Sequence, residues 1–327
     1  MKKYIPFTEK YRPKNYNDLI IDKIIKTKIE SIIQSKEMPN MILTGKSGIG
    51  KTATIHCIVK AIYAKENIPD AILELNACDD RGIKTVQDTI VNFCKKKIDF
   101  IKNYAQHKLV ILDEADNITP KAQRLINLIM DKYTNTKIVF ICNNTTDIIE
   151  SIQSRAVIIR FSKPPLDKVI ERLELICNKE NILFEKNALK LIFDFSQKDI
   201  RQTINMLELI YYSLNKDDNI ITIEKINDLC DIPPQTLMNE LLNSILTKDI
   251  RNIIKILKSF QENGYYSQDV LLHFIQHLQY YINTLNVVNP QYDQLINILN
   301  NLAYSAYDMS KTNSTFLQLT SSIVQLL

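Results

Sequence analysis

The 327-residue chain has no tryptophan, only five glycines and no long uninterrupted apolar segment. No apolar run approaches the roughly 18 residues that a membrane helix needs, so we expect no transmembrane segment. The first residues, Met1–Tyr4, lead into further charges instead of an apolar stretch, which argues against a secretory signal peptide. These absences predict an intracellular protein without a membrane anchor.

Paired cysteine motifs are absent as well. The six cysteines are scattered along the chain, and no two of them form a C-x-x-C pair. This spacing argues against a zinc ribbon and a disulfide framework, and it favours reduced, mostly buried thiols. The formal net charge is only +4. Such a mild charge permits nucleic-acid binding, but only through a local patch.

The hydrophobic pattern predicts an α/β domain followed by helices. A hydrophobic content of 45% and a charged content of 24% are typical of a globular protein, and the length suits two or three domains. The first part of the chain alternates short apolar runs with helical patterns, which is typical of a parallel sheet. The predicted strands are Met41–Thr44, Ile72–Leu75, Leu109–Leu112, Lys137–Cys142 and Val157–Phe161.

Two proline-rich breaks divide the remainder of the chain. After Lys163–Pro165 the strand signals stop, and helical periodicity begins, as in Leu166–Asn178. A second break falls at Ile232–Pro234, and helical patterns continue beyond it. The predicted domains are an α/β nucleotide-binding domain at 1–162, a small helical domain at 163–231 and a larger all-helical domain at 232–327.

Three of the five glycines fall within a phosphate-binding motif. Residues 45–52 match G-x-x-x-x-G-K-[ST], between a predicted strand and a segment with helical spacing. In such a loop, backbone N–H groups curl around the β-phosphate, the Lys51 ammonium reaches the β and γ oxygens, and the Thr52 hydroxyl can ligate Mg²⁺. The motif predicts ATP as ligand, with contacts from Gly45, Lys46, Ser47, Gly48, Ile49, Gly50, Lys51, Thr52 and Ala53.

Polar residues also end two of the other predicted strands. Asp113 and Glu114 directly follow Leu109–Leu112, at the strand end where open α/β sheets bind ligands. We expect Asp113 to hold Mg²⁺ and Glu114 to polarise the attacking water. Asn143 ends a further strand, where an amide could orient that water or contact the γ-phosphate, although Asn at a strand end also commonly caps a turn.

These motifs, with their neighbours, resemble the replication factor C small-subunit family. The Pro6–Lys14 segment is similar to the family's P-W-x-E-K-Y-R-P-K box, and Leu73–Ile83 is similar to its E-L-N-A-S-D-x-R-G-I box. The sensor-1 strand, the S-R-C motif and the sensor-2 segment have counterparts in Ile141–Asn143, Ser154–Ala156 and Asp199–Leu207. The resemblance covers residues 6–208. It implies an AAA+ fold whose small helical domain is a lid and whose last domain is an oligomerisation collar.

The resemblance also implies roles for individual residues. Thr8 and Arg12 would lie over the nucleotide, Asn143 would be sensor 1, and Arg201 would contact the γ-phosphate from the lid. Arg155 would be an arginine finger that reaches ATP held by a neighbouring subunit, a role that suits a planar, permanent charge.

Four positions depart from the family pattern. Phe7 stands in place of Trp, which should preserve packing, and Ala156 stands in place of Cys beside the predicted finger. Lys198 replaces the usual Gly before the sensor-2 segment, which could perturb the turn that aims Arg201. Asn127–Leu128 stands where relatives carry an Arg-Arg pair, so the basic pair that an intersubunit or DNA-sensing role would use is absent from this position.

Three further patterns are candidates for DNA, clamp or metal contacts. Arg81 and Lys84 stand at a predicted helix start, where N–H groups and basic side chains can meet DNA phosphates. A helical segment with the pattern Q-x-x-I-x-x-F is similar to a peptide that plugs into a sliding clamp, but ordinary core packing explains its apolar positions equally well. Its residues are Gln87, Ile90 and Phe93. A third pattern, H-x-x-x-H at positions 273 and 277, lacks the Glu of a metalloprotease motif.

The sequence therefore predicts a DNA-dependent ATPase subunit of a clamp loader, with ATP and Mg²⁺ as cofactors. The resemblance implies other loader subunits in a hetero-oligomeric, pentameric ring as partners, together with a sliding clamp and primer–template DNA. The expected compartment is the nucleus in a eukaryote, or the cytoplasm or a viral replication site otherwise. The alternatives are a Holliday-junction helicase type of AAA+ motor, which would lack the box at Leu73–Ile83, and a non-hydrolysing scaffold, which should have lost Lys51, Glu114 or Arg155.

Overall fold

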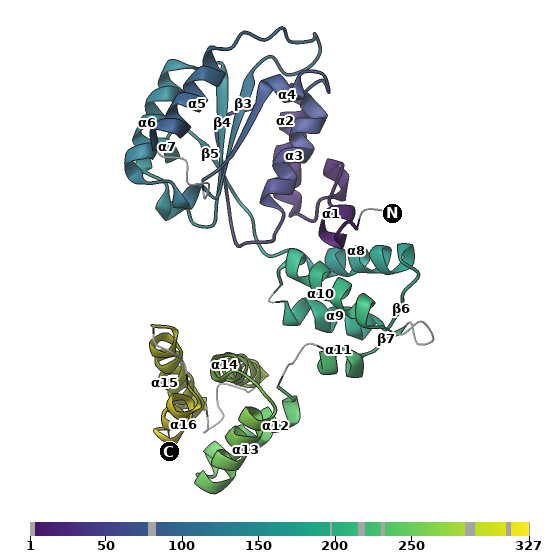
Figure 1. Cartoon of the computed structure of the whole chain (residues 1–327), viewed down its shortest axis with the longest axis vertical. Helices are drawn as coiled ribbons and strands as arrows, with labels where there is room; N and C mark the ends of the chain where they lie inside the picture. The colour runs from purple at the N-terminus through teal and green to yellow at the C-terminus, as the bar shows by residue number, and fades with distance from the viewer. Residues whose placement is uncertain are drawn as a thin grey trace. The chain divides into compact units, whose positions relative to one another are not determined.

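The computed structural model divides the chain into two compact units, Met1–Ile226 and Asn227–Leu327 (Figure 1). The division falls a few residues before the boundary predicted at 231/232. The predicted boundary at 162/163 lies inside the first unit and stays a prediction. The residues that the structure describes are 4–77, 83–196, 198–214, 220–229, 233–284, 292–311 and 315–326.

The first unit is built on a five-stranded parallel sheet with the order β2-β3-β4-β1-β5. Its strands are β1 (Met41–Thr44), β2 (Ile72–Asn76), β3 (Lys108–Asp113), β4 (Thr136–Cys142) and β5 (Val157–Arg160). All five segments predicted as strands are therefore confirmed, within one residue at each end. The order places β1 between β4 and β5, so the strand that precedes the phosphate-binding motif lies inside the sheet.

Helices cover both faces of this sheet (Figure 1). Alternate residues of β1 explain why: Met41 and Leu43 pack in a core with α2 and α3, whereas Ile42 packs in a core with α5 and α6. Side chains of a strand alternate between faces, so both faces need an apolar cover. The covering helices are α2 (Lys23–Ser35), α3 (Lys51–Ile62), α5 (Ile83–Lys95) and α6 (Pro120–Lys132). Shorter elements are α1 (Phe7–Lys10), η1 (Tyr16–Asp18), α4 (Ile68–Ala71), η2 (Ala115–Asn117), η3 (Thr145–Asp147) and α7 (Glu150–Gln153).

Helices also dominate the remainder of the first unit, as predicted. They are α8 (Leu166–Lys179), α9 (Lys186–Phe195) and α10 (Ile200–Ser213), and α11 (Ile223–Leu229) spans the division between the units. The structure adds a small parallel pair, β6 (Leu183–Phe184) with β7 (Ile220–Ile221), where we expected no strands. Two residues are too few to give a strand periodicity, so the sequence pattern could not predict this pair.

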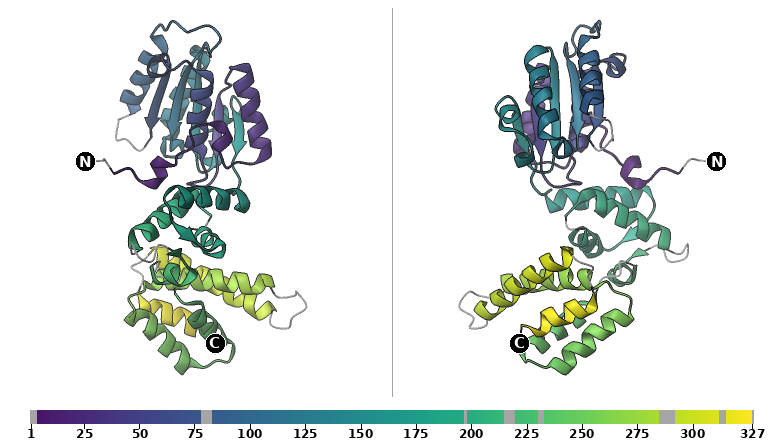
Figure 2. Two further views of the ribbon diagram at one scale, coloured as in Figure 1. Left: turned by 90° about the vertical axis from the view of Figure 1, so that its right-hand side faces the viewer. Right: turned by 60° about the vertical axis from the view of Figure 1, so that its left-hand side comes forward.

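The second unit is helical throughout its described residues, in agreement with the sequence. Its helices are α12 (Gln235–Leu246), α13 (Ile250–Glu262), α14 (Ser267–Thr284), α15 (Tyr292–Lys311) and α16 (Phe316–Val324). Figure 2 shows α14 and α15 side by side, and fully buried residues such as Leu241, Phe260 and Phe274 form one core among the helices. Among the helices described, none is long and apolar enough to cross a membrane.

We expect one buried side chain in the first unit, His107, to make the stability of the chain depend on pH. His107 precedes β3, is only 6% exposed, and meets the Tyr63 ring edge-on with the two ring centroids 5.6 Å apart. Its Nε2 has no hydrogen-bond partner among the described residues. Burial, together with the charge of Lys137, lowers the pKa of His107 from 6.5 to about 4. The folded chain therefore holds this imidazole neutral.

We predict that replacing His107 by Phe makes the stability of the chain less sensitive to acid. As pH falls below 6.5, the unfolded His107 takes up a proton that the folded residue does not, so stability is lost until pH reaches about 4. The loss should amount to about 3 kcal/mol, at 1.36 kcal/mol per pKa unit between 6.5 and about 4. Thermal unfolding of both proteins from pH 7.5 to 4.5 measures it. Parallel curves would show that another group carries the acid sensitivity.

Candidate active site

The phosphate-binding loop follows β1 and leads directly into α3. Thr44, the last residue of β1, pairs with Cys142 at the end of β4. Gly48 has a φ of +68°, which L side chains rarely adopt, and a Cβ there would lie 1.7 Å from Asp199 Oδ1. A Cβ on Gly45 would lie 2.7 Å from the Phe161 carbonyl oxygen. At both positions, therefore, the neighbours and the backbone require glycine.

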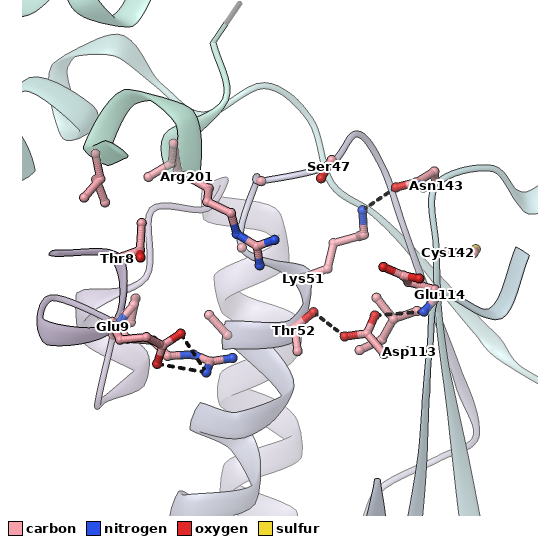
Figure 3. A pocket seen from close by; sticks show the side chains of 18 of the residues that line it. Thr8, Glu9, Ser47, Lys51, Thr52, Asp113, Glu114, Cys142, Asn143 and Arg201 are labelled. Carbon is pink, nitrogen blue, oxygen red and sulfur yellow. Dashed lines mark hydrogen bonds and ion pairs between the residues drawn. The ribbon is translucent and has the colours of Figure 1, made fainter. Parts of the chain in front are cut away.

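Lys51 lies in the cavity that this loop borders, and its side chain has lost most of its contact with water (Figure 3). Its Nζ donates to the carbonyl oxygens of Gly45 (2.5 Å) and Lys46 (2.8 Å) and to Asn143 Oδ1 (3.1 Å). Burial lowers the pKa of Lys51, an effect that nearby acidic groups, Asp113 among them, oppose. A partly desolvated ammonium favours an anion beside it, because the anion compensates the lost hydration.

Oxygen groups suited to a magnesium ion adjoin Lys51. The Thr52 hydroxyl donates to Asp113 Oδ2 at 3.0 Å, so the first turn of α3 meets the end of β3. Hydroxyl and carboxylate oxygens are ligands that Mg²⁺ accepts, and together they fit the predicted role of these two residues. Glu114 follows with a φ of +54°, a left-handed conformation that is uncommon for a non-glycine residue. This backbone turns Glu114 toward the cavity that it lines (Figure 3).

Asn143, at the end of β4, is held between two charged groups. Its Oδ1 accepts from Lys51, while its backbone N–H and its Nδ2 donate to Asp116 Oδ2 at 3.2 and 3.0 Å. Asp116 lies on η2, and its other oxygen, Oδ1, is buried without a partner among the described residues. Sequence reasoning identified Asn143 but missed Asp116, because a contact across 27 residues leaves no local pattern.

Helix α10 brings Arg201 to the same cavity. Asp199 caps this helix by accepting from the backbone N–H groups of Arg201 (2.8 Å) and Gln202 (3.1 Å). Lys198, which replaces the family's Gly, adopts a φ of +66°. The position therefore retains the left-handed turn, at a cost of order 1 kcal/mol for a side chain in this region. Figure 3 shows Arg201 extending from α10 into the cavity.

The N-terminal segment contributes Thr8 and Arg12 to the cavity and is anchored to α10. The buried Glu208 of α10 accepts from the Tyr4 hydroxyl at 2.6 Å and from the Phe7 backbone N–H at 3.1 Å. Because α10 also carries Arg201, one helix positions both this arginine and the N-terminal wall of the site. No local pattern predicts this role, since Glu208 looks in the sequence like an ordinary surface residue.

Arg155 does not line this cavity. It follows α7 and is bound to the face of α6. Its Nε and Nη2 lie 3.1 and 3.2 Å from the Asp131 carboxylate oxygens. Its Nη1 donates to Asn127 Oδ1 at 3.1 Å. Its side chain is nevertheless 43% exposed. Asn127, which stands where the family has Arg, is thus a contact of the predicted finger.

A third residue that sequence reasoning missed joins α6 to the segment before Arg155. Gln123 is fully buried; its Nε2 donates to the carbonyl oxygens of Ile118 (2.9 Å) and Asp147 (2.7 Å), and its Oε1 accepts from the Ile149 N–H at 2.8 Å. A glutamine on the apolar face of an amphipathic helix was the available signal.

The predicted DNA and clamp residues have different outcomes. Arg81 lies outside the described residues, and so do the side chains of Lys84 and Gln87, although α5 begins at Ile83 as predicted. Ile90 is fully buried, and the partly buried Phe93 packs against the same core. The structure thus favours core packing over clamp contact for these two residues, because their apolar surface covers the sheet.

The histidine pair on α14 does not form a recognisable metal site. His277 Nε2 lies 3.0 Å from Asn239 Oδ1, and burial lowers the pKa of both His273 and His277. Within the described part of the chain, no group of three or more His, Cys, Asp or Glu side chains could hold a metal ion.

Comparisons with known proteins show which family the chain is similar to. Residues 41–163 match the AAA family, described as ATPases associated with various cellular activities. A protein of Acanthamoeba polyphaga mimivirus, named as a replication factor C small subunit, is 33% identical over 100% of this chain and 98% of its own length. Replication factor C subunit 4 of Saccharomyces cerevisiae is 34% identical over 82% of this chain and 80% of its own.

The chain belongs to the replication factor C small-subunit family. Such a match over the full length confirms the resemblance in the motifs and makes the chain an AAA+ ATPase that binds a nucleotide. A solved structure of Thermotoga maritima RuvB, a Holliday junction branch migration motor, aligns with a TM-score of 0.55 at 14% identity, covering 72% of this chain and 79% of that one. At this low identity the likeness concerns the AAA+ fold alone.

We predict that Lys51→Ala weakens ATP binding by about 10²- to 10⁴-fold, because charge-assisted hydrogen bonds to two phosphate oxygens, each worth roughly 1.5–3 kcal/mol, are lost. Lys60→Ala is the matched control, since it removes the same charge from the same helix, α3, at an exposed position outside the cavity. Equilibrium binding of a fluorescent ATP analogue measures both. Equal affinities for the two variants would contradict the role of Lys51.

Proposed function

We propose that the chain is an ATP-hydrolysing small subunit of a hetero-oligomeric clamp loader, which opens a sliding clamp and places it on primer–template DNA. The observation that carries this proposal is the full-length similarity to replication factor C subunits. It is supported by the meeting of Lys51, Asp113, Glu114, Asn143 and Arg201 at a single cavity.

In this proposal the cavity residues divide the chemistry of hydrolysis. Lys51 and Arg201 bind the β- and γ-phosphate oxygens, and Glu114 orients and polarises the attacking water. Thr52 and Asp113 would hold Mg²⁺, which would neutralise charge that develops on the phosphates. Thr8 and Arg12, on the N-terminal side of the cavity, would cover the rest of the nucleotide.

Arg155 is the residue that we propose acts on a neighbouring subunit. Arg155 lies outside the chain's own cavity and is substantially exposed, which supports a contact with another molecule. An arginine at a surface can reach a phosphate in a neighbouring site and stabilise its transition-state charge. We therefore propose that Arg155 acts in trans, within an oligomer of related subunits.

DNA and the clamp complete the proposed set of partners. Arg81 and Lys84 stand in the sequence at the start of α5, and basic side chains at a helix N-terminus suit contacts with a phosphate backbone. We propose these two as DNA contacts and assign no residue to the clamp. The nucleus, the cytoplasm and a viral replication site all remain consistent with this function.

Neither alternative function has comparable support. A Holliday-junction motor is favoured only by the shared fold of RuvB at 14% identity. A non-hydrolysing scaffold should lack catalytic groups, yet Lys51, Glu114 and Arg155 are all present. Hydrolysis of the ATP bound to this chain, within the assembled loader, would exclude the scaffold.

We predict that Arg155→Ala lowers ATP hydrolysis only when the chain is assembled with its partner subunits. An arginine finger is typically worth 10³–10⁵ in rate, and an assembly with several active sites would show a smaller average loss. The assay compares steady-state hydrolysis by the isolated chain and by the purified assembly, with and without the substitution. A large loss in the isolated chain would mean that Arg155 acts on its own ATP, contrary to the proposal.

We predict that Arg81→Ala combined with Lys84→Ala weakens DNA binding and DNA-stimulated hydrolysis but spares ATP binding. Losing two phosphate contacts should reduce the salt dependence of DNA affinity by up to about 1.8 in slope, at −0.9 per contact. Titrations of the assembled loader with primer–template DNA at several salt concentrations test this. Lys186→Ala with Lys255→Ala, which removes two exposed lysines elsewhere, is the control. Identical slopes for both double variants would place the DNA path at other residues.

A further inference from the structure

The amide of Asn143 lies between a group that only donates hydrogen bonds and a group that only accepts them. On one side, the Lys51 ammonium donates to Asn143 Oδ1 at 3.1 Å. On the other, the Asp116 carboxylate accepts from Asn143 Nδ2 at 3.0 Å and from the Asn143 backbone N–H at 3.2 Å. An ammonium has three donors and no acceptor, and a carboxylate has only acceptors, so neither can exchange roles.

This chemistry fixes which way the amide faces. In the reverse orientation, Nδ2 would point its hydrogens at the Lys51 ammonium and Oδ1 would point its lone pairs at the Asp116 carboxylate. Both contacts would then be repulsive, and two charge-assisted hydrogen bonds would be lost. The backbone bond from Asn143 to the same carboxylate oxygen also keeps Asp116 in place while the side chain bonds to it. Asn143 therefore presents an oxygen toward the phosphate side of the cavity.

We propose that Asp116 is a positioning residue for ATP hydrolysis, which holds Asn143 so that its Oδ1 accepts hydrogen bonds from Lys51 and from the attacking water. An amide oxygen has two lone pairs, and Lys51 uses one of them. The second is available to a water molecule, whose proton it would accept while Glu114 polarises the same water. This inference rests on the proposed function, because it presupposes that the cavity hydrolyses ATP. It assigns Asn143 the role of an acceptor from the attacking water instead of a donor to the γ-phosphate.

The burial of one carboxylate oxygen of Asp116 supports a role in this arrangement. Its Oδ1 is buried and without a partner among the described residues, while its Oδ2 takes both bonds from Asn143. A carboxylate with one unpartnered buried oxygen is costly for folding alone. A purely structural link from η2 to the end of β4 could be made by a neutral side chain. A neutral amide at position 116, however, could donate as well as accept and would no longer fix the orientation of Asn143.

The substitution Asp116→Asn tests the proposal, because it keeps the shape of the side chain and removes its acceptor-only character. In the assembled loader with primer–template DNA, we expect the rate of a single turnover of ATP to fall about 10- to 100-fold, as for a misplaced catalytic group. The dissociation constant for ATP and the thermal midpoint should change little. Asp116→Glu retains a pure acceptor and should hydrolyse faster than Asp116→Asn, which covers the case in which Asp116→Asn folds poorly.

The double variant separates positioning from a general effect of charge or structure. If Asp116 acts through Asn143, then Asp116→Asn should cause no further loss of rate in an Asn143→Ala background. Losses that multiply in the double variant, or a wild-type rate for Asp116→Asn, would overturn the proposal. A wild-type rate for Asn143→Ala alone would instead refute the proposed role of Asn143 itself, so the two failures can be told apart.

Discussion

The parallel pairing of β1, β3 and β4 is the constraint on which the rest of the site depends. Leu43 and Thr44 pair with Ile141 and Cys142, so β1 and β4 end level with each other, and β3 pairs with β4 on its other side. Parallel strands all point their carboxyl ends to one edge of the sheet. The residues that follow them are thereby brought within hydrogen-bond distance, as the contacts of Lys51 with Asn143 and of Thr52 with Asp113 demonstrate.

Within that frame, the charge of Lys51 organises the polar groups around it. A largely buried ammonium needs oxygen partners, and it takes two loop carbonyls and the amide of Asn143. The amide in turn takes Asp116, so a chain of oriented polar groups reaches from the loop to η2. Phosphate oxygens are stronger acceptors than neutral carbonyls, and they can replace the loop carbonyls at Lys51 without disturbing the Asn143–Asp116 bond.

The sequence was sufficient for the parts of the fold that depend on local patterns. The five strands of the main sheet are apolar runs bounded by polar residues, and residues 45–52 carry a contiguous motif. The sequence did not predict contacts between distant segments, because such contacts leave no local pattern. They are Asp116 with Asn143, Glu208 with Phe7, and Arg155 with Asp131. The β6–β7 pair was missed for the opposite reason, because each strand is too short to leave any pattern.

The binding of Arg155 to its own α6 is compatible with a finger that serves another molecule. Its ion pair with Asp131 is exposed on both sides, at 43% and 49%, and exposed ion pairs contribute only about 0–1 kcal/mol. In the hydrogen bond to Asn127 the acceptor is a neutral amide oxygen, so this contact adds no ion pair. A phosphate carries more negative charge than Asp131 and offers several acceptor oxygens to the guanidinium. These contacts thus hold the side chain extended along α6 and leave it free to exchange a weak carboxylate partner for a stronger phosphate one.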